Sequence, residues 1–500
     1  MTPAATTARV QDSLEIERAS SLGVRLAGSG LVVAAATGAA GWYLTLLLGR
    51  LDGAASHAYD LAFFQQLVWN LVNGNGLISS FESGNFLGLH FSPLLILAAG
   101  IETVSPDVRV LTVLHVIGLA ALGPTAFLFV SQILRPARAA RMVAAVLTAP
   151  IPFWALTQRA AVADFHTEAI GIPLAMLAGW AGLSGRLRWM WLLAVAALLA
   201  KEDQAWSVAV VALVVGLRAG AGAPRIRRHA GSLAGGSLVY GILVVSLVMP
   251  AIRGATGGTT PFGEYYGWLP ESVRVGGPVA AAAAIVRTMV RPEGLAVAGG
   301  AILSGAGLGL LRPRWLLVLV PPLVLNLLSV HEPQPALGLH YGLSLVVPTV
   351  VATALGARRL LAIANGRWSR PGASRWTWVL AVPALVVAVV QSPFPPALTA
   401  GGPFARPAAR EQLASAAAVI PPAAPIAADD GLAALLANRR HLTLLHMPIP
   451  SGAYVIADRL PSIPGYVDRH QREASLEVVA RERPLLYDDG RFRVWGPHDG

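Results

Sequence analysis

Residues 26–49 read LAGSGLVVAAATGAAGWYLTLLLG, a run of 24 residues without a charged side chain. A helix rises about 1.5 Å per residue and the hydrocarbon core of a bilayer is about 30 Å thick, so this run is long enough to cross a membrane. Similar runs recur along the 500-residue chain, which is 55% hydrophobic and 13% charged, with a mean hydropathy of +0.59. Soluble domains are about 25% charged. The sequence therefore predicts an α-helical integral membrane protein.

The segment before this run and the lack of cysteine set further limits. Residues 1–25 are polar and mixed in charge, and the apolar run is longer than that of a cleavable signal peptide. We therefore expect a cytoplasmic N-terminal segment followed by a retained membrane anchor. A chain with no cysteine cannot form disulfides, thiolate nucleophiles or thiolate metal sites.

We interpret eleven apolar segments as membrane crossings. They lie near residues 26–49, 107–133, 142–157, 168–184, 188–200, 204–217, 231–250, 293–311, 315–330, 341–357 and 376–394. One set of the loops between them carries arginine and no Asp or Glu: Arg135, Arg138, Arg141; Arg186, Arg188; Arg218, Arg225, Arg227, Arg228; Arg312, Arg314; Arg358, Arg359, Arg367, Arg370 and Arg375. The other set carries most of the remaining acids: Asp52, Asp60, Glu82, Asp107, Asp164, Glu168, Glu202, Asp203, Glu264, Glu271 and Glu332.

This alternation predicts the orientation of the chain. Arginine-rich loops remain in the cytoplasm, so the N-terminus lies inside and the C-terminus outside the cytoplasmic membrane. The formal net charge of +11 is then a property of the cytoplasmic loops, and we expect no nucleic-acid partner.

Two regions near the outer side depart from simple crossings. A crossing by residues 86–104 would invert every later loop, so we interpret them as a re-entrant or interfacial helix packed on protein. The predicted helices 188–200 and 204–217 are short, the first rising only about 20 Å. We expect AKEDQAW (200–206), at their shared apex, to lie below the outer surface in a water-filled cavity.

The composition of the sequence changes after about residue 398. Charges rise, and short β-rich runs appear in APIAAD, HLTLLHM and AYVIAD, while LLYDDGRFRVW has the pattern of a hairpin around Asp489-Gly490. We predict a transmembrane domain over 26–397 with a first external loop at 50–106. A soluble extracytoplasmic α/β domain follows over 398–500, and the Pro/Gly-rich stretch 392–407 is its linker.

Titratable residues gather at the predicted outer ends of the helices. Ionisable groups at membrane depth are costly and usually line a pathway or a site, so we expect these residues to share one outward-facing cavity. They form five groups along the chain: His57 and Asp60; His90; Asp164, His166 and Glu168; Lys201, Glu202 and Asp203; His331, Glu332, His340 and Tyr341.

Asp60, in SHAYDLAFFQQLVWN (56–70), has two interpretations. Its carboxylate is placed to cap an interfacial helix over 61–73, whose apolar face carries Leu61 and Phe64 and whose other face carries Gln66 and Asn70. The alternative is a catalytic role.

The run DFHTE (164–168) also has two interpretations. Asp164 is placed to cap the helix that follows, and its spacing to Glu168 would put both carboxylates on one helix face. Together with His166 they form a candidate site for a divalent cation, Mg or Mn, because such ions take oxygen-rich ligand sets.

Lys201 and His90 remain open in the same way. Lys201 is the single lysine of the chain, and it either neutralises Glu202 and Asp203 in the turn or binds an anionic phosphate. His90 either hydrogen-bonds a broken helix or faces the substrate.

Several segments together resemble a bacterial family of predicted membrane proteins of undefined function. They are YDLAFFQQLVW, HFSPLL, DFHTEAIGIPL, LLAKEDQAW, HYGLSLVVP and, near the C-terminus, APIAADDGLAALLANRRHLTLL. That family is similar to the GT-C glycosyltransferases, which take a sugar from a polyprenyl-phosphate carrier. In those enzymes an acid in the first external loop is the catalytic base.

The resemblance implies roles for individual residues. Asp60 matches the first-loop acid and would take the acceptor's proton. The donor phosphate and substrate would be bound by residues of the outer groups and the first loop: His90, Lys201, His331, His340, Tyr341 and Gln65. The first loop lacks the Asp-x-Asp or Asp-Glu pair of the commonest pattern, which argues against a metal bound at that loop.

The resulting expectation is a GT-C-like glycosyltransferase at the outer face of the cytoplasmic membrane. It would move a sugar from a polyprenyl-phosphate donor to a cell-envelope glycan, lipid or protein. The alternatives are a flippase for a lipid-linked saccharide, which would need access from both faces, and a non-catalytic scaffold.

Overall fold

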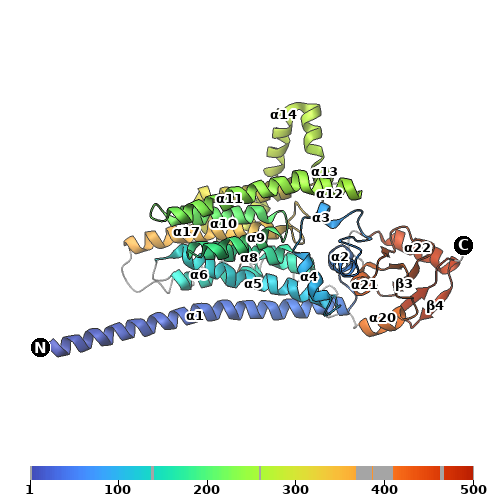
Figure 1. The fold of residues 1–500 in the computed structure, drawn as a ribbon, viewed down its shortest axis with the longest axis horizontal. Helices are drawn as coiled ribbons and strands as arrows, with labels where there is room; N and C mark the ends of the chain where they lie inside the picture. The colour runs from blue at the N-terminus through green and yellow to red at the C-terminus, as the bar shows by residue number, and fades with distance from the viewer. Residues whose placement is uncertain are drawn as a thin grey trace.

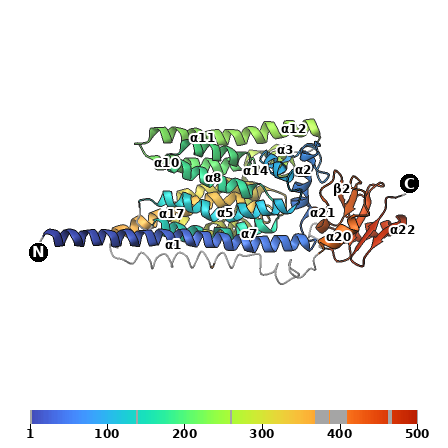
Figure 2. The same cartoon turned by 60° about the horizontal axis from the view of Figure 1, so that its bottom comes forward.

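The computed structural model describes residues 3–136, 140–257, 261–367, 386, 409–461 and 467–498. It consists of a helical bundle and a smaller α/β domain at one end of it (Figure 1). The N-terminus lies at the opposite end of the bundle from that domain (Figures 1 and 2).

The bundle is built from helices that run mostly along one axis. Its α-helices are α1 (Pro3–Asp52), α2 (Phe63–Val72), α3 (Phe86–Leu89), α4 (Leu95–Glu102), α5 (Arg109–Leu134), α6 (Ala140–Thr148), α7 (Ala155–Val162), α8 (Glu168–Leu183), α9 (Leu187–Leu198), α10 (Gln204–Ala219), α11 (Pro224–Leu243), α12 (Met249–Thr256), α13 (Pro261–Tyr266), α14 (Trp268–Met289), α15 (Pro292–Ser304), α16 (Val320–Leu328) and α17 (Val346–Arg367). Short 3₁₀ and π segments connect or extend them: η1 (Ala58–Ala62), η2 (Ile151–Phe153), η3 (Val244–Val248), η4 (Leu308–Leu311), η5 (Pro313–Leu319) and η6 (Tyr341–Leu345).

Length and apolar composition mark several of these helices as membrane spans. Five are long and apolar enough to cross a bilayer: Leu26–Asp52, Arg109–Leu134, Ala140–Val162, Pro224–Thr256 and Tyr341–Ile363. A sixth is obtained if the pair Phe262–Met289 and Pro292–Ser304, bent by 58°, is one span. Four further apolar helices are shorter: Glu168–Leu183, Leu187–Leu198, Gln204–Ala219 and Pro313–Leu328. The protein is a multi-pass membrane protein.

The eleven predicted crossings are thus shown only in part. Five to six described segments have the length of a span, and segments such as 188–200 form the short helices that their length suggested. The last predicted crossing, 376–394, lies almost entirely outside the described residues. The eight residues of α4 rise only about 12 Å, so residues 86–104 contain no helix long enough to cross.

The bundle core is made of small and branched apolar side chains. Alanines and valines allow α1, α5, α6, α8 and α17 to approach closely, and larger side chains such as Tyr43, Phe129 and Trp154 fill the spaces between them. One helical hairpin leaves the bundle: α14 is broken at Gly277, whose φ of 75° does not fit a helix, and it projects away from the other helices in Figure 1.

The C-terminal domain is a five-stranded sheet flanked by helices, as the β-rich runs predict. Its strands have the order β2-β1-β3-β5-β4. They are β1 (Ile426–Ala428), β2 (Leu442–Leu444), β3 (Tyr454–Asp458), β4 (Leu485–Asp488) and β5 (Phe492–Trp495), with helices α20 (Arg410–Ala417), α21 (Asp430–Leu436) and α22 (Arg469–Glu482). The β1 pairings with β2 and β3 are parallel, and β4–β5 is the predicted hairpin, with Gly490 at φ 89° in its turn.

The two faces of this sheet pack on different partners. Ala427, Val455 and Trp495 face α22. The opposite face, with Ile456 and Phe492, shares one hydrophobic core with α20, α21 and the first-loop helices. The domain is therefore packed on the first loop through a continuous apolar core.

Helix α2 carries the polar side of this interface. The amides of Gln66 and Asn70, expected on a polar face, are fully buried. Gln66 donates to the carbonyl of Arg439 at 3.0 Å and accepts from Ser79 Oγ at 2.6 Å and from the backbone N–H of Ser80 at 2.8 Å. The Gln66 amide, which would face water on an isolated interfacial helix, instead attaches the C-terminal domain, while Asn70 donates to the carbonyl of Ile78 in the first loop at 2.9 Å.

Truncating Gln66 should loosen this attachment. Gln66→Ala leaves the groups that it binds without partners in a buried place, so we expect a loss of about 1–3 kcal/mol in the free energy of unfolding. Protease release of the C-terminal domain, followed on gels in detergent, measures it. Gln471→Ala, on an exposed position of α22, is the matched control; equal proteolysis of the two variants would contradict the interpretation.

The predicted orientation can be tested with single cysteines, since the chain has none of its own. We expect Ser451→Cys to react with an impermeant maleimide in intact cells, and Gly222→Cys to react only after permeabilisation. Both positions are exposed, and neither change removes an arginine. Labelling of residue 222 but not 451 in intact cells would invert the topology.

Candidate functional site

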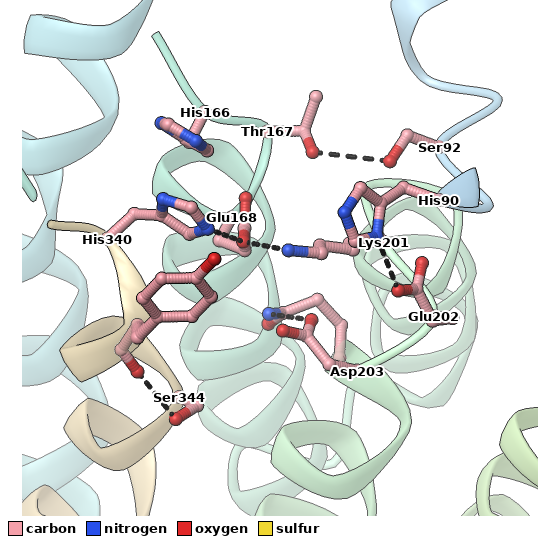
Figure 3. A network of polar contacts seen from close by, with 12 residues as sticks. His90, Ser92, His166, Thr167, Glu168, Lys201, Glu202, Asp203, His340 and Ser344 are labelled. Atoms are coloured by element: carbon pink, nitrogen blue, oxygen red, sulfur yellow. Dashed lines mark hydrogen bonds and ion pairs between the residues drawn. The ribbon is translucent and has the colours of Figure 1, made fainter. Parts of the chain in front are cut away.

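The five predicted groups of titratable residues meet at the end of the bundle that carries the C-terminal domain. Each group contributes at least one side chain to the ion pairs and close polar contacts found there: Asp60, His90, Asp164, His166, Glu168, Lys201, Glu202 and His340. Figure 3 shows most of this set gathered around the start of α8 and the turn between α9 and α10. Side chains far apart in sequence thus form one buried polar site.

Asp60 lies within the π-helical turn η1, which continues into α2. Because η1 begins after His57, which makes no side-chain cap, Asp60 is not a helix N-cap, and the capping interpretation is wrong. The side chain is 13% exposed, and burial raises the pKa of Asp60 well above its usual range. Single π turns inside helices are frequent at functional sites, which fits a role for this carboxylate.

Asp164 stabilises the turn beside Asp60. It has a left-handed φ of 61° and lies before α8, so it neither caps that helix nor shares a helix face with Glu168, contrary to expectation. Its carboxylate accepts the backbone N–H of His57 at 3.0 Å and pairs with Arg50 at 3.6 Å. Arg50 also donates to the carbonyl of Val162 at 2.7 Å, so it ties the end of α1 to this loop.

Lys201 and Glu168 form a buried ion pair between the α9–α10 turn and the first turn of α8. Glu202 turns away from Lys201 and accepts from the backbone N–H of Phe91 at 2.9 Å, with its other oxygen 3.0 Å from His90 Nδ1 (Figure 3). Lys201 thus forms its ion pair with Glu168, while, against the effect of burial, the charges of Glu168, Asp203 and Glu202 raise the pKa of Lys201. His90, which lies between α3 and α4, therefore contacts Glu202 of the α9–α10 turn, and its two interpretations stay open.

Two histidines link Asp60 to this ion pair. The imidazole of His166 lies with Nε2 3.4 Å from Asp60 Oδ1, and its ring stacks on that of His340 with centroids 3.5 Å apart. His340 Nε2 is 3.8 Å from Glu168. Burial lowers the pKa of His166 to about 3 and that of His340 well below its usual range, so both rings are neutral.

The predicted metal triplet of Asp164, His166 and Glu168 does not form. Asp164 is engaged by Arg50 and Glu168 by Lys201, so two of the three ligands bind cations of the protein. The set whose ligand atoms do converge in the described part of the chain is Asp60, His166 and His340, within 4.8 Å of one another.

A cavity of about 380 Å³ opens beside the ion pair. Its polar end is formed by His90, Lys201, Glu202, Asp203 and His340. Burial raises the pKa of Asp203 to about 7. The rest of the wall is apolar or aromatic and includes Leu238, Ile242, Val245, Phe262, Tyr265, Tyr266, Pro322 and Leu325. The cavity therefore combines a charged end with an apolar wall, and residues of the AKEDQAW apex line it.

The other predicted substrate residues divide between the cavity and the domain interface. Tyr341 lines the cavity. His331 is not among the lining residues, but its ring stacks on that of Tyr265, which is, with the ring centroids 4.9 Å apart. Gln65 is elsewhere: its amide donates to Glu102 and to Asn438 of the C-terminal domain, each at 2.7 Å. Gln65 is thus an interface residue, and the prediction that it faces substrate is wrong.

Sequence reasoning missed Arg50, Asp430 and the aromatic wall. Asp430, at the start of α21, accepts the backbone N–H of Ala58 at 3.3 Å and so reaches η1 from the C-terminal domain. Arg50 carried a usable signal, because it is an arginine at the end of the first span where the positive-inside rule disfavours one.

Comparison with models of known protein families identifies the family of the chain. Residues 50–472 match the family described as Predicted membrane protein (DUF2079). The chain belongs to this family. The matched region includes every residue of the polar site and most of the C-terminal domain, so the predicted-membrane-protein family covers both parts of the structure. No curated protein matches the chain at a significant level.

The Lys201–Glu168 pair should contribute strongly to stability. Removing one partner of a buried pair leaves the other charge uncompensated and costs about 3–5 kcal/mol. We therefore expect Lys201→Met and Glu168→Leu each to lower the free energy of unfolding by that amount, and the double variant to recover most of the loss. Denaturant titration followed by tryptophan fluorescence measures this; single variants as stable as the parent would contradict a structural role for the pair.

Proposed function

We propose that the protein is a membrane glycosyltransferase that transfers a sugar from a polyprenyl-phosphate donor to a cell-envelope glycan, lipid or protein at the outer face of the cytoplasmic membrane. The observation that carries the proposal is the cavity beside α8 and α10, with its apolar wall and its polar end. An amphipathic cavity of this kind, buried among membrane helices, suits a lipid with a polar head group.

The apolar wall fits the isoprenoid part of the donor. Leu238, Ile242 and Val245 of α11 and η3 line the cavity, as does Leu325 of α16. The same surface of α11 has exposed apolar side chains, including Ile242 at 66%, which would face lipid. An isoprenoid chain bound against α11 would therefore contact apolar side chains that also line the cavity.

The polar end fits a sugar phosphate. Carboxylates such as Glu202 and Asp203 accept hydrogen bonds from hydroxyl groups, and the rings of Tyr265 and Tyr266 offer flat apolar faces for a pyranose or furanose. Lys201 has three N–H donors, and Glu168 engages one of them. The others are available for a phosphate oxygen, so the ion pair does not prevent Lys201 from binding the donor.

Asp60 supplies the base in this proposal. The acceptor hydroxyl oxygen attacks the anomeric carbon, the bond between that carbon and the phosphate oxygen breaks, and polyprenyl phosphate leaves with the bonding electrons. The hydroxyl proton passes to the carboxylate of Asp60. Asp60 lies next to His166, whose ring stacks on that of His340, a residue of the cavity lining.

Asp60→Asn tests this role. The amide keeps the size of the side chain but removes the basic oxygen, so we expect turnover to fall by about 10²–10⁴-fold while donor binding and the melting temperature stay near the parental values. The assay is sugar transfer by purified protein from radiolabelled polyprenyl-phosphate sugars. A flippase has no hydroxyl to deprotonate, so its transport would not need Asp60. The proposal would be refuted if neither the parent nor Asp60→Asn transferred sugar and both moved a lipid-linked saccharide across the membrane at the same rate.

A further inference from the structure

We propose that Asp60, His166 and His340 form a binding site for one divalent transition-metal ion of the zinc class. The three side chains come from η1, from the loop before α8 and from the residue before η6, and all three are buried. One oxygen or nitrogen atom from each lies within 4.8 Å of the others. The site stands on this geometry; its part in sugar transfer rests on the proposed function.

The spacing within the cluster fits a shared metal better than a hydrogen bond. An N–H···O hydrogen bond joins atoms about 2.7–3.2 Å apart, and His166 Nε2 is 3.4 Å from Asp60 Oδ1. Two ligand atoms that each lie about 2.0–2.1 Å from a tetrahedral zinc ion are separated by about 3.3 Å. The two side chains therefore already stand at the separation that such an ion requires.

Both histidines keep a buried nitrogen without a partner. In the described part of the chain, Nδ1 of His166 and Nδ1 of His340 have no hydrogen-bond partner. Buried polar atoms are nearly always satisfied, and each exception needs a physical reason. Each ring therefore has a nitrogen that no described group of the protein occupies, so both imidazoles can act as metal ligands.

The charges around the cluster also call for a cation. Three carboxylates lie together here, and the described cations pair with only two of them: Arg50 with Asp164, and Lys201 with Glu168. Asp60 has the imidazole of His166 as its near neighbour instead. A buried carboxylate without a cation is costly, and a divalent ion would supply the missing charge.

The ligand types select the class of metal. Two imidazole nitrogens and one carboxylate oxygen are the ligand set of catalytic zinc sites, which keep a further position for water or a substrate oxygen. Mg and Ca prefer sites made of oxygen atoms alone. A carboxylate that binds a metal through one oxygen keeps the other, so metal binding by Asp60 is compatible with its acceptance of a proton.

Metal content and cobalt spectroscopy test the site without any sugar substrate. Full-length protein in detergent is stripped with chelator, dialysed, and titrated with Zn²⁺ or with Co²⁺ as a coloured probe. We expect one ion per chain and visible Co²⁺ absorption bands of tetrahedral or five-coordinate intensity. His166→Ala, His340→Ala and Asp60→Asn should each weaken binding by about 100-fold or more, because changes outside the ligand shell already cost about 10–100-fold.

Two variants serve as controls. His470→Ala removes an exposed histidine of α22 and should bind the ion as the parent does. Asp164→Asn removes a carboxylate of the same site that pairs with Arg50, and it should retain the ion if the ligands are those proposed. Metal binding is compared only among variants whose melting temperature is close to that of the parent. If an alanine variant unfolds, His166→Gln or His340→Gln takes its place.

The outcomes separate this proposal from the proposed function. Stoichiometric binding that His166→Ala abolishes supports the site, whether or not the protein transfers sugar. No Zn²⁺ or Co²⁺ binding, binding unchanged in His166→Ala and His340→Ala, or competition by Mg²⁺ at equal concentration would overturn the site. If sugar transfer continued at the parental rate after complete chelation, the glycosyltransferase proposal would stand and the ion would have no part in the transfer reaction.

Discussion

The buried ion pair of Lys201 and Glu168 holds the polar site in place. It joins the turn between two short helices to the first turn of α8, and Glu168 also faces His340 from the loop before α17. The two side chains are only 9% and 4% exposed, so separation of the pair would be costly. The recessed α9–α10 turn, the cavity beside it and the histidine pair all depend on this contact.

A second constraint is that the C-terminal domain is part of the site. Its sheet shares a hydrophobic core with the first-loop helices, and Asp430 reaches the backbone of η1 two residues before Asp60. Amides on α2 bind the same domain. Because burial of these amides requires the domain to be docked, the conformation of the turn that carries Asp60 and the position of the domain are coupled.

The site explains why a carboxylate lies at the end of the first span. Burying the Asp60 carboxylate without partners would be costly. On the protein surface, a role as a helix cap would have been enough to explain an aspartate at this position. The structure instead surrounds it with a histidine pair, an adjacent Asp164–Arg50 pair and a domain interface. Such costly arrangements of ionisable groups are typical of functional sites, although they do not by themselves name a reaction.

The sequence predicted those features that depend on local composition. Apolar runs of sufficient length must be buried in lipid or protein, so the membrane class, the helix positions and the short helices around Lys201 followed from periodicity and length. The strand runs of the C-terminal domain and the Asp489-Gly490 hairpin were equally local, since backbone preferences decide them. Even the collection of five titratable groups at one end was predictable, because burial of charge is costly wherever it occurs.

The partners within that collection were decided by tertiary structure alone. Spacing placed Asp164, His166 and Glu168 together, but the left-handed backbone at Asp164 points its carboxylate to Arg50, and Glu168 meets Lys201 from another turn. Gln65 has the same kind of side chain as a substrate ligand and becomes an interface residue because the C-terminal domain docks on α2. The cluster of Asp60, His166 and His340 joins residues that are more than a hundred positions apart in the chain, and only the packing of three separate segments brings their ligand atoms within reach of one another.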